Sequence, residues 1–130
     1  MNRSKLFLAL TFGALFFVSC SNDDAPTPEV PLGTYDNGVL VLNQGGFGHG
    51  DASVSYISSD FSVQQNDIFS IVNPTILLGD TGQDMGLNDD KAYIVLNVSN
   101  KIQIVNRYTM QNITSITEGL KNPRYIAFAN

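Results

Sequence analysis

The sequence predicts an all-β domain, a partial β-propeller of four-stranded antiparallel blades, preceded by a signal-peptide helix. After residue 20, no stretch keeps apolar residues at helical spacing for three turns. Short strand-like runs separated by Gly, Asn and Asp recur instead. The chain also repeats itself, because residues 39–43 match residues 93–97, and residues 53–57 match residues 101–105. A repeat of roughly 40 to 55 residues with four strands per unit is typical of propeller blades.

Residues 1–19 predict a lipoprotein signal peptide. Arg3 and Lys5 precede an apolar stretch over residues 6–18, and a small residue, Ser19, stands before Cys20. This order is typical of a secretory signal, and a Cys at the cleavage point is typical of a bacterial lipoprotein. The apolar stretch is shorter than the roughly 20 residues that a membrane-spanning helix needs. A buried core helix is the alternative, but it explains neither the basic start nor the single Cys. We therefore expect lipidation of Cys20.

Residues 20–34 are expected to form a flexible tether, because they contain Pro, Asp and Asn but almost no apolar pattern. The domain itself then spans residues 35–130. Without Arg3 and Lys5, 5 of the 7 basic residues remain against 12 acidic ones, a net charge of −7. This charge argues against nucleic acid as a partner. With Cys20 lipidated, no thiol remains for a disulfide, a nucleophile or a zinc site.

The expected strands follow one another closely, and we place them, in chain order, at residues 39–42, 54–58, 63–69, 85–87, 92–98, 101–106, 113–116 and 124–129. Residues 92–98 are nearly all apolar, which predicts a middle strand buried on both faces. Residues 88–91 are typical of a hairpin turn. Pro123 is expected to introduce the innermost strand of a third unit. Asn43 and Asn97 occupy matching positions, and we expect their side chains to bond their own loop backbone.

Three segments carry a resemblance to a known family: residues 41–45, 78–83 and 123–128. Together with residues 92–105 they resemble the YVTN-type propeller repeat, and residues 38–130 resemble surface lipoproteins with such propellers. Among these are corrinoid-binding propeller lipoproteins that serve a TonB-dependent vitamin B12 transporter. The acidic pair Asp23-Asp24 after Cys20 resembles the surface-export signal of Bacteroidota-type lipoproteins. The resemblance implies an outer-membrane, cell-surface protein that binds a small ligand such as a corrinoid and has a TonB-dependent transporter as partner.

The number of repeats predicts a piece of a larger wheel. A propeller closes with 4 to 8 blades, whereas this sequence encodes about two. We expect an N-terminal fragment of a longer protein. A short chain that assembles with copies of itself is the alternative.

Strand direction predicts where a site would lie. Neighbouring antiparallel strands reverse direction, so the connections of each unit divide between two ends of the sheets. One end is expected to collect residues 43–51, 79–83, 97–100 and 119–124; the other collects residues 58–60, 88–91 and 107–112. The first set is richer in Gly, aromatic and amide side chains. We expect a ligand there, bound by Gln44, Phe47, His49, Gln83 and Arg124.

The glycine-rich segment 44–51 would bring backbone N–H groups close to a ligand, with Phe47 and His49 as stacking surfaces. The alternative interpretation of this segment is a long mobile connection. Gln83 and Arg124 would donate hydrogen bonds or charge, and the alternative for Arg124 is an ion pair with Asp80 or Asp84. One histidine without a Cys or carboxylate cluster is a poor metal site, so we expect no metal and no cofactor.

The sequence therefore predicts a binding module and not an enzyme. A surface adhesion or protein-interaction scaffold is the alternative. A propeller enzyme, such as a lyase or dehydrogenase, ranks last, because His49 is the single histidine and no Ser-His-Asp order with a nucleophile elbow is present.

Overall fold

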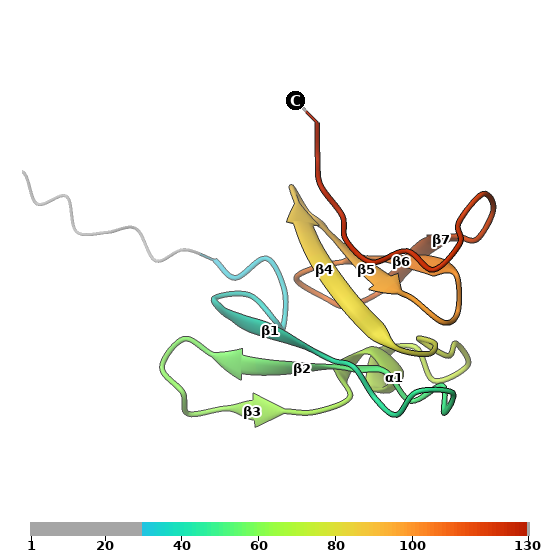
Figure 1. Cartoon of the computed structure of the whole chain (residues 1–130). Coiled ribbons are helices and arrows are strands. Elements are labelled where there is room, and N and C mark those ends of the chain that lie inside the picture. The colour runs from blue at the N-terminus through green and yellow to red at the C-terminus, as the bar shows by residue number, and fades with distance from the viewer. Residues whose placement is uncertain (1–29, 130) are drawn as a thin grey trace, which may run out of the picture.

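Two antiparallel β-sheets form the part of the chain that the computed structural model describes, residues 30–129 (Figure 1). Sheet 1 consists of β1 (Gly38–Asn43), β2 (Ser53–Ser58) and β3 (Gln64–Gln65). Sheet 2 consists of β4 (Gly82–Asn88), β5 (Lys91–Leu96), β6 (Lys101–Asn106) and β7 (Asn112–Ile116). One short helix, α1 (Ile68–Val72), stands between them in the described sequence. The all-β prediction is confirmed.

The predictions for the first 29 residues, the signal peptide with Cys20 and most of the tether, lie outside the described residues. Within residues 30–129, no helix is long and apolar enough to cross a membrane.

The internal repeat of the sequence is confirmed by the topology. Strand order β1-β2-β3 in sheet 1 corresponds to β5-β6-β7 in sheet 2, and all these pairs are antiparallel. The matching segments 39–43 and 93–97 therefore hold equivalent places. Sheet 2 carries one further strand, β4, on the free side of β5. The predicted hairpin at residues 88–91 is also confirmed, since Asn88 pairs with Lys91 across it.

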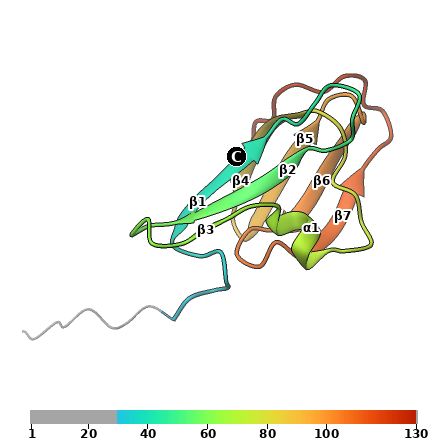
Figure 2. The same cartoon turned by 90° about the horizontal axis from the view of Figure 1, so that it is seen from below.

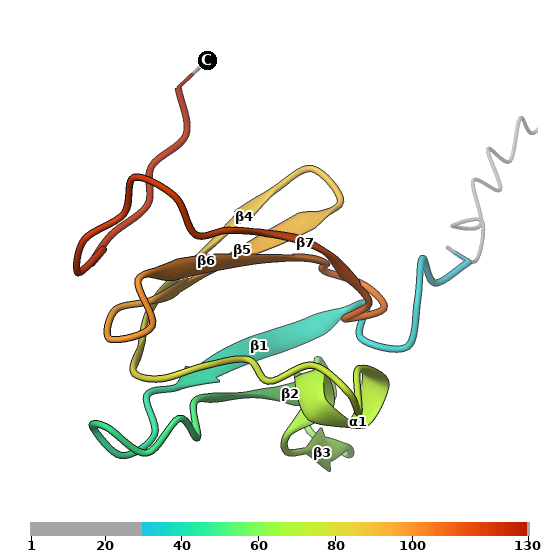
Figure 3. The ribbon, with the colours of Figure 1, turned by 90° about the vertical axis from the view of Figure 1, so that its right-hand side faces the viewer.

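The sheets form two layers that meet at β1 and β4 and enclose the core (Figures 2 and 3). Alternate residues of each strand point into it, because successive strand side chains face opposite sides. Sheet 1 supplies Leu40, Leu42, Val54 and Tyr56, and sheet 2 supplies Met85, Ala92, Ile94, Leu96 and Val105. The prediction that residues 92–98 are a doubly covered middle strand is confirmed for β5, in which Ala92, Ile94, Val95 and Leu96 are fully buried.

The strand predicted at residues 63–69 is largely wrong. Only β3 forms there, and the chain then turns at Asp67, whose φ of 55° is left-handed, into α1. Ile68 and Phe69 are neighbours, and both are fully buried in the core. Neighbouring residues of an edge strand point to opposite faces, so only one of them would be buried, whereas a helical turn brings both to one side. Burial of two adjacent side chains therefore favours the helix.

The strand predicted at residues 124–129 is also wrong, because no strand of the described chain pairs with this segment. It runs over the face of sheet 2 that points away from sheet 1 (Figure 3). The Ile126 N–H donates to the Asp84 carboxylate over 2.9 Å, and the Phe128 ring lies edge-on to Tyr93 with centroids 5.1 Å apart. Residues 122–128 thus form a third layer on sheet 2.

Asn73, at the end of α1, joins the helix to sheet 2. Its side-chain amide donates to the carbonyls of Phe69 and Met110, each over 2.9 Å, and its carbonyl oxygen accepts the Asn112 N–H over 2.9 Å. The side chain is buried, so these hydrogen bonds are shielded from water. Asn73 therefore fixes α1 against the β6–β7 turn.

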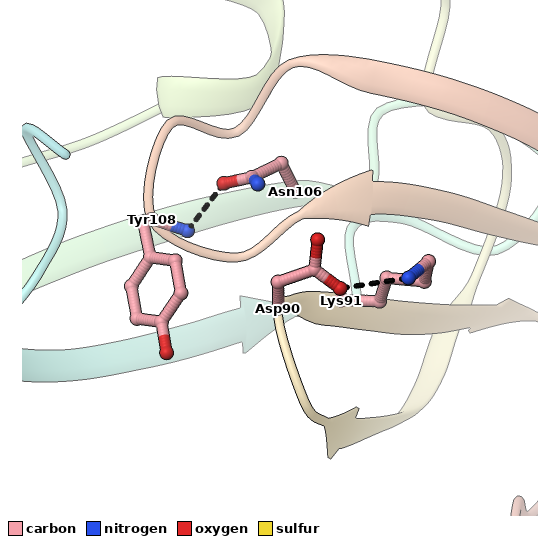
Figure 4. A network of polar contacts seen from close by, with 4 residues as sticks. All are labelled: Asp90, Lys91, Asn106 and Tyr108. Atoms are coloured by element: carbon pink, nitrogen blue, oxygen red, sulfur yellow. Dashed lines mark hydrogen bonds and ion pairs between the residues drawn. The ribbon is translucent and has the colours of Figure 1, made fainter. Parts of the chain in front are cut away.

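The chain enters the domain at the end that holds the β4–β5 and β6–β7 turns. The Tyr35 N–H donates to the Tyr108 carbonyl over 2.8 Å, and the Tyr56 hydroxyl donates to the Asp36 carbonyl over 2.6 Å. Figure 4 shows the neighbouring turns, where the Tyr108 N–H donates to Asn106 and Lys91 pairs with Asp90 over 2.7 Å. This end is called the entry end below.

At the same end, Asp60 organises the turn between β2 and β3. Its carboxylate accepts hydrogen bonds from the Ser58 hydroxyl (2.6 Å), the Ser62 N–H (3.1 Å) and the Ser62 hydroxyl (2.8 Å). These bonds stabilise the charged form, led by the one from the Ser58 hydroxyl, and they lower the pKa of Asp60 to about 2.

Replacing Asn73 with Ala is expected to lower the free energy of unfolding by about 1–3 kcal/mol, because the Asn112 N–H and the Met110 carbonyl lose their side-chain partner, whereas the Phe69 carbonyl keeps the backbone N–H of residue 73. Urea denaturation measures the loss. The control is Gln111→Ala, an exposed amide close by in the chain, which should stay within about 0.5 kcal/mol of the parent. Equal losses for both variants would contradict the role given to Asn73.

Acid is expected to loosen the β2–β3 turn. The folded pKa of Asp60, about 2, lies below the ordinary value of 3.8. The stabilisation is therefore present above pH 3.8 and is lost as the pH falls through the folded pKa. NMR of the Asp60 carboxyl carbon should titrate near pH 2, with the Ser62 amide shift moving in step. Ser62→Ala should raise that midpoint; an unchanged midpoint would show that Ser62 is not a cause.

Candidate functional site

Four loops gather at the end of the sheets opposite the entry end (Figure 1). They are residues 43–51, 79–83, 97–100 and 119–124, the set that strand direction predicted, and they are called the loop face below. The first loop joins two strands of sheet 1, the second and third adjoin strands of sheet 2, and the fourth leads into the third layer. The loop face therefore combines segments from sheet 1, sheet 2 and the third layer.

The first two loops are bonded to each other through their backbones. The Ala52 N–H donates to the Gly79 carbonyl over 3.1 Å, and the Gly82 N–H donates to the Gln44 carbonyl over 3.0 Å. The Asp80 carboxylate accepts the Gly48 N–H over 3.2 Å. These contacts hold the glycine-rich loop of sheet 1 against the start of β4.

The series of contacts continues across sheet 2 to the third layer. The Asp80 N–H donates to the Ser99 hydroxyl over 2.8 Å, and the Asn97 N–H donates to the Thr81 carbonyl over 2.9 Å. The Asn97 side chain then donates to the Pro123 carbonyl over 2.9 Å. In the last contact, the side chain of Asn100 accepts the Asn122 N–H over 2.7 Å. The loop face is therefore a continuous bonded surface.

The glycine-rich loop has a defined backbone of its own. Gly45, Gly48 and Gly50 have φ values of 76°, 80° and 71°, which side-chain-bearing residues rarely adopt. The Gly46 N–H donates to the Asp51 carboxylate over 2.7 Å, and the Gly46 carbonyl accepts the His49 N–H over 3.0 Å. The loop thus forms a tight turn closed by Asp51.

All five predicted ligand contacts lie on the loop face, but they differ in exposure. Gln44, Phe47, His49 and Arg124 are exposed, with 77% of the Phe47 side chain accessible. The His49 ring lies beside Gly46, whose missing side chain leaves room for it. Gln83 is half-buried at an irregularity of the β4–β5 register between Gly82 and Asp84. Such bulges aim a side chain away from the regular alternation.

The proposed ion pair of Arg124 with Asp80 or Asp84 is wrong for the described structure. Among residues 30–129 the ion pair that forms is Lys91–Asp90. The Asp84 carboxylate instead accepts the N–H groups of Met85 and Ile126, each over 2.9 Å. Arg124 therefore leaves its guanidinium at the surface of the loop face.

A concavity of about 360 Å³ lies at the entry end, lined by Val30, Leu32, Asp36 and Asn37. None of these was a predicted site residue, and none of them belongs to the loop face.

Sequence reasoning missed the residues that hold the loops together. Asp80 is the central one, because it bonds Gly48, Ser99 and the Thr81 hydroxyl. Its position between Gly79 and a Thr-Gly pair was the available signal, since short polar residues between glycines favour tight turns. The expectation for the matched asparagines is wrong. Asn97 bonds the next layer, and Asn43 bonds the hydroxyls of Ser53 and Ser55 on β2.

Within residues 30–129, no group of three or more His, Cys, Asp or Glu side chains is arranged to hold a metal ion. The chemistry that the loop face offers is non-covalent: an exposed aromatic ring, an imidazole, amides and a guanidinium around a glycine-rich backbone. Such groups bind flat or polar ligands by stacking and hydrogen bonding.

A comparison with protein families gives one match. A family model described as a domain of unknown function (DUF5074) matches residues 37–128, which covers both sheets and the third layer. No curated protein matches the chain.

Replacing a glycine of the glycine-rich loop by alanine should distinguish the cost of a left-handed backbone from the cost of a steric clash. Gly50→Ala has open space and is expected to cost about 1–2 kcal/mol of unfolding free energy from its left-handed backbone alone. Gly45→Ala adds a clash with the Asp51 carboxylate that closes the loop, so its cost should be clearly larger. Urea denaturation and hydrogen exchange of the Gly48 amide measure both effects. Equal costs would contradict the described loop closure.

Proposed function

We propose that this chain, which belongs to the family described as a domain of unknown function (DUF5074), is a binding module of a lipid-anchored cell-surface protein. Its loop face captures a small ligand. The two sheets and the third layer act as successive blades of a partial β-propeller. Cys20 carries the lipid, and the outer membrane is the site of anchoring.

One observation carries the proposal: loops that are distant in the sequence are bonded in succession into a single surface. Ordering loops costs conformational entropy. A surface whose loops are already ordered does not incur that cost again when a ligand binds. The exposed Phe47 ring and the His49 imidazole stand on this ordered base. Exposed aromatic side chains of this kind supply much of the binding energy at recognition sites.

The direction of the loop face agrees with a surface role. The chain enters at the opposite end, where Tyr35 bonds Tyr108. β1 then runs the length of sheet 1 to the loop face, six residues or about 20 Å away. With the lipid on Cys20, the loop face is therefore the end of the domain farther from the attachment of the tether, which leaves it accessible to ligands.

Corrinoid is the ligand class that the resemblance of the sequence supports. A corrinoid is a large flat ring system with amide side chains, and it needs both stacking surfaces and hydrogen-bond donors. Phe47 and His49 are the stacking groups, and Gln44, Gln83 and Arg124 are the polar contacts. A TonB-dependent outer-membrane transporter is the partner that would receive such a ligand.

A second function, adhesion or protein interaction, is favoured by the shape of the surface. The concavity of about 360 Å³ lies at the entry end and not on the loop face. Two large apolar side chains in or near the loop face are exposed, Leu77 at 82% and Phe47 at 77%, and a protein partner would cover them. We assign no catalytic role, because the sequence has a single histidine.

Titration calorimetry of the full chain with cobalamin tests the first function. We expect binding, and Phe47→Ala should weaken it about fivefold to tenfold, because stacking on an aromatic ring contributes about 1 kcal/mol or somewhat more. The control is Phe61→Ala, which removes an equally exposed phenylalanine (80%) from the opposite end of the sheets. Cobalamin binding should not change in this variant.

No heat with cobalamin at tens of micromolar would end the corrinoid proposal. Purification of a protein partner that depends on Phe47 but not on Phe61 would then support the adhesion function. Equal effects of Phe47→Ala and Phe61→Ala on every ligand would contradict a site on the loop face.

A further inference from the structure

We infer that Thr81 is a positioning residue of the loop face. Its hydroxyl orients the carboxylate of Asp80, and that carboxylate holds Gly48 in the glycine-rich loop. Holding Gly48 fixes the turn that presents Phe47 and His49. The inference deepens the function proposed above and rests on it where ligand binding is concerned. The order of the glycine-rich loop can be measured without a ligand and tests the inference separately.

The backbone of Thr81 has a conformation that disfavours a threonine. Its φ is 58°, in the left-handed region, where a β-branched residue is a clear outlier. Glycine and asparagine adopt this region more readily. Asn122, at the start of the third layer, is an example, with a φ of 45°. Backbone outliers of this kind cluster at functional sites. The reason for a threonine at this position is therefore to be sought in its side chain.

The hydroxyl of Thr81 supplies that reason. It donates to the Oδ1 atom of Asp80 over 2.8 Å, and only 4% of Thr81 is exposed. The same Oδ1 atom accepts the Gly48 N–H over 3.2 Å. The buried hydroxyl therefore holds the carboxylate in the rotamer that reaches the neighbouring loop. A side chain that is already fixed loses less conformational entropy when it makes this second hydrogen bond.

The backbone on which the carboxylate stands is itself held by sheet 2. The Asp80 N–H donates to the Ser99 hydroxyl over 2.8 Å, and the Thr81 carbonyl accepts the Asn97 N–H over 2.9 Å. These bonds fix the peptide groups on both sides of the left-handed residue. The orientation of the Asp80 carboxylate is then the remaining freedom, and the Thr81 hydroxyl restricts it.

The hydrogen bond from Gly48 to Asp80 has no substitute in the described chain. Within residues 46–50, the other hydrogen bonds that form stay inside the glycine-rich loop. A Cβ atom at Gly48 would meet nothing within 4 Å, so packing around this part of the loop is sparse. Gly48 stands between Phe47 and His49 in the sequence. Its bond to Asp80 therefore determines where the two rings are presented.

NMR order parameters of the backbone amides in the full chain test the inference without a ligand. Thr81→Val removes the hydroxyl but keeps a branched side chain, and the order parameter of the Gly48 amide should fall from about 0.85 to below about 0.6. Thr81→Ser keeps the hydroxyl and should stay close to the parent value. The Gly46 amide, which donates to Asp51, is the internal control and should not change. An unchanged Gly48 amide in Thr81→Val, or equal losses in both variants, would overturn the inference.

A second comparison asks whether Thr81 acts through Asp80. Asp80→Ala should loosen the Gly48 amide as much as Thr81→Val does, and the double variant should loosen it no further, because residues in one network are not additive. Additional loosening in the double variant would contradict the order of action. Asp80→Ala also serves if Thr81→Val does not fold, since a Gly48 amide that stays ordered without the carboxylate would overturn the inference.

Titration calorimetry with cobalamin connects the order of the loop to binding. Under the proposed function, Thr81→Val should weaken binding about threefold to tenfold, because the ligand must then order the loop. Thr81→Ser should retain the parent affinity. If the parent chain does not bind cobalamin, the corrinoid proposal ends, and the order parameters alone decide the inference. An unchanged affinity in a Thr81→Val variant whose Gly48 amide is disordered would overturn the positioning role.

Discussion

The structure depends on a central strand that is apolar on both faces. In β5, Ala92, Ile94 and Leu96 belong to the core shared with sheet 1, whereas Val95 is fully buried outside that core, on the opposite face. Burial of apolar surface contributes about 25 cal/mol per Å², so a sheet with two apolar faces is stable only between two other layers. Sheet 1 covers one face, and residues 122–128 cover part of the other. Layering is therefore imposed by the composition of one strand.

Layering also creates the loop face. A chain that finishes one layer must cross to the next, and antiparallel order brings each crossing back to the same end. The crossings carry their own polar groups, and these bond one another because no strand pairs with them: Asp80 with Gly48 and Ser99, and Asn97 with Pro123. The apolar side chains are buried between the layers. The side chains left on the loop face then include amides, an imidazole, a guanidinium and one aromatic ring, which is a composition suited to recognition.

Sequence patterns predicted the strands and turns whose formation depends on neighbouring residues alone. Alternating side chains predicted β2, a continuous apolar run predicted β5, and two successive Asp residues predicted the β4–β5 turn. Helix α1 was missed because five residues are too few to display a helical period. The segment 124–129 was misassigned because a strand is defined by its partner, which no local pattern reveals. Charge complementarity suggested a partner for Arg124, but Asp84 satisfies the Ile126 N–H instead. An unpaired backbone donor is costlier than a lost surface ion pair, which contributes about 0–1 kcal/mol.

Each layer after the first packs onto the previous layer through its opening segment, and this packing links the loop face to the stacking of the layers. Strand β4 opens sheet 2 and packs onto sheet 1 through Met85, and residues 122–128 open the third layer and pack onto sheet 2 through Ile126. The contacts that hold the loop face cross the same boundaries: Gly48 to Asp80 between the first two layers, and Asn97 to Pro123 between the last two. Under the proposed binding function, a ligand across these loops would contact two layers at once. Because coupling is reciprocal, such a ligand would strengthen the stacking by the same free energy by which tighter stacking favours ligand binding.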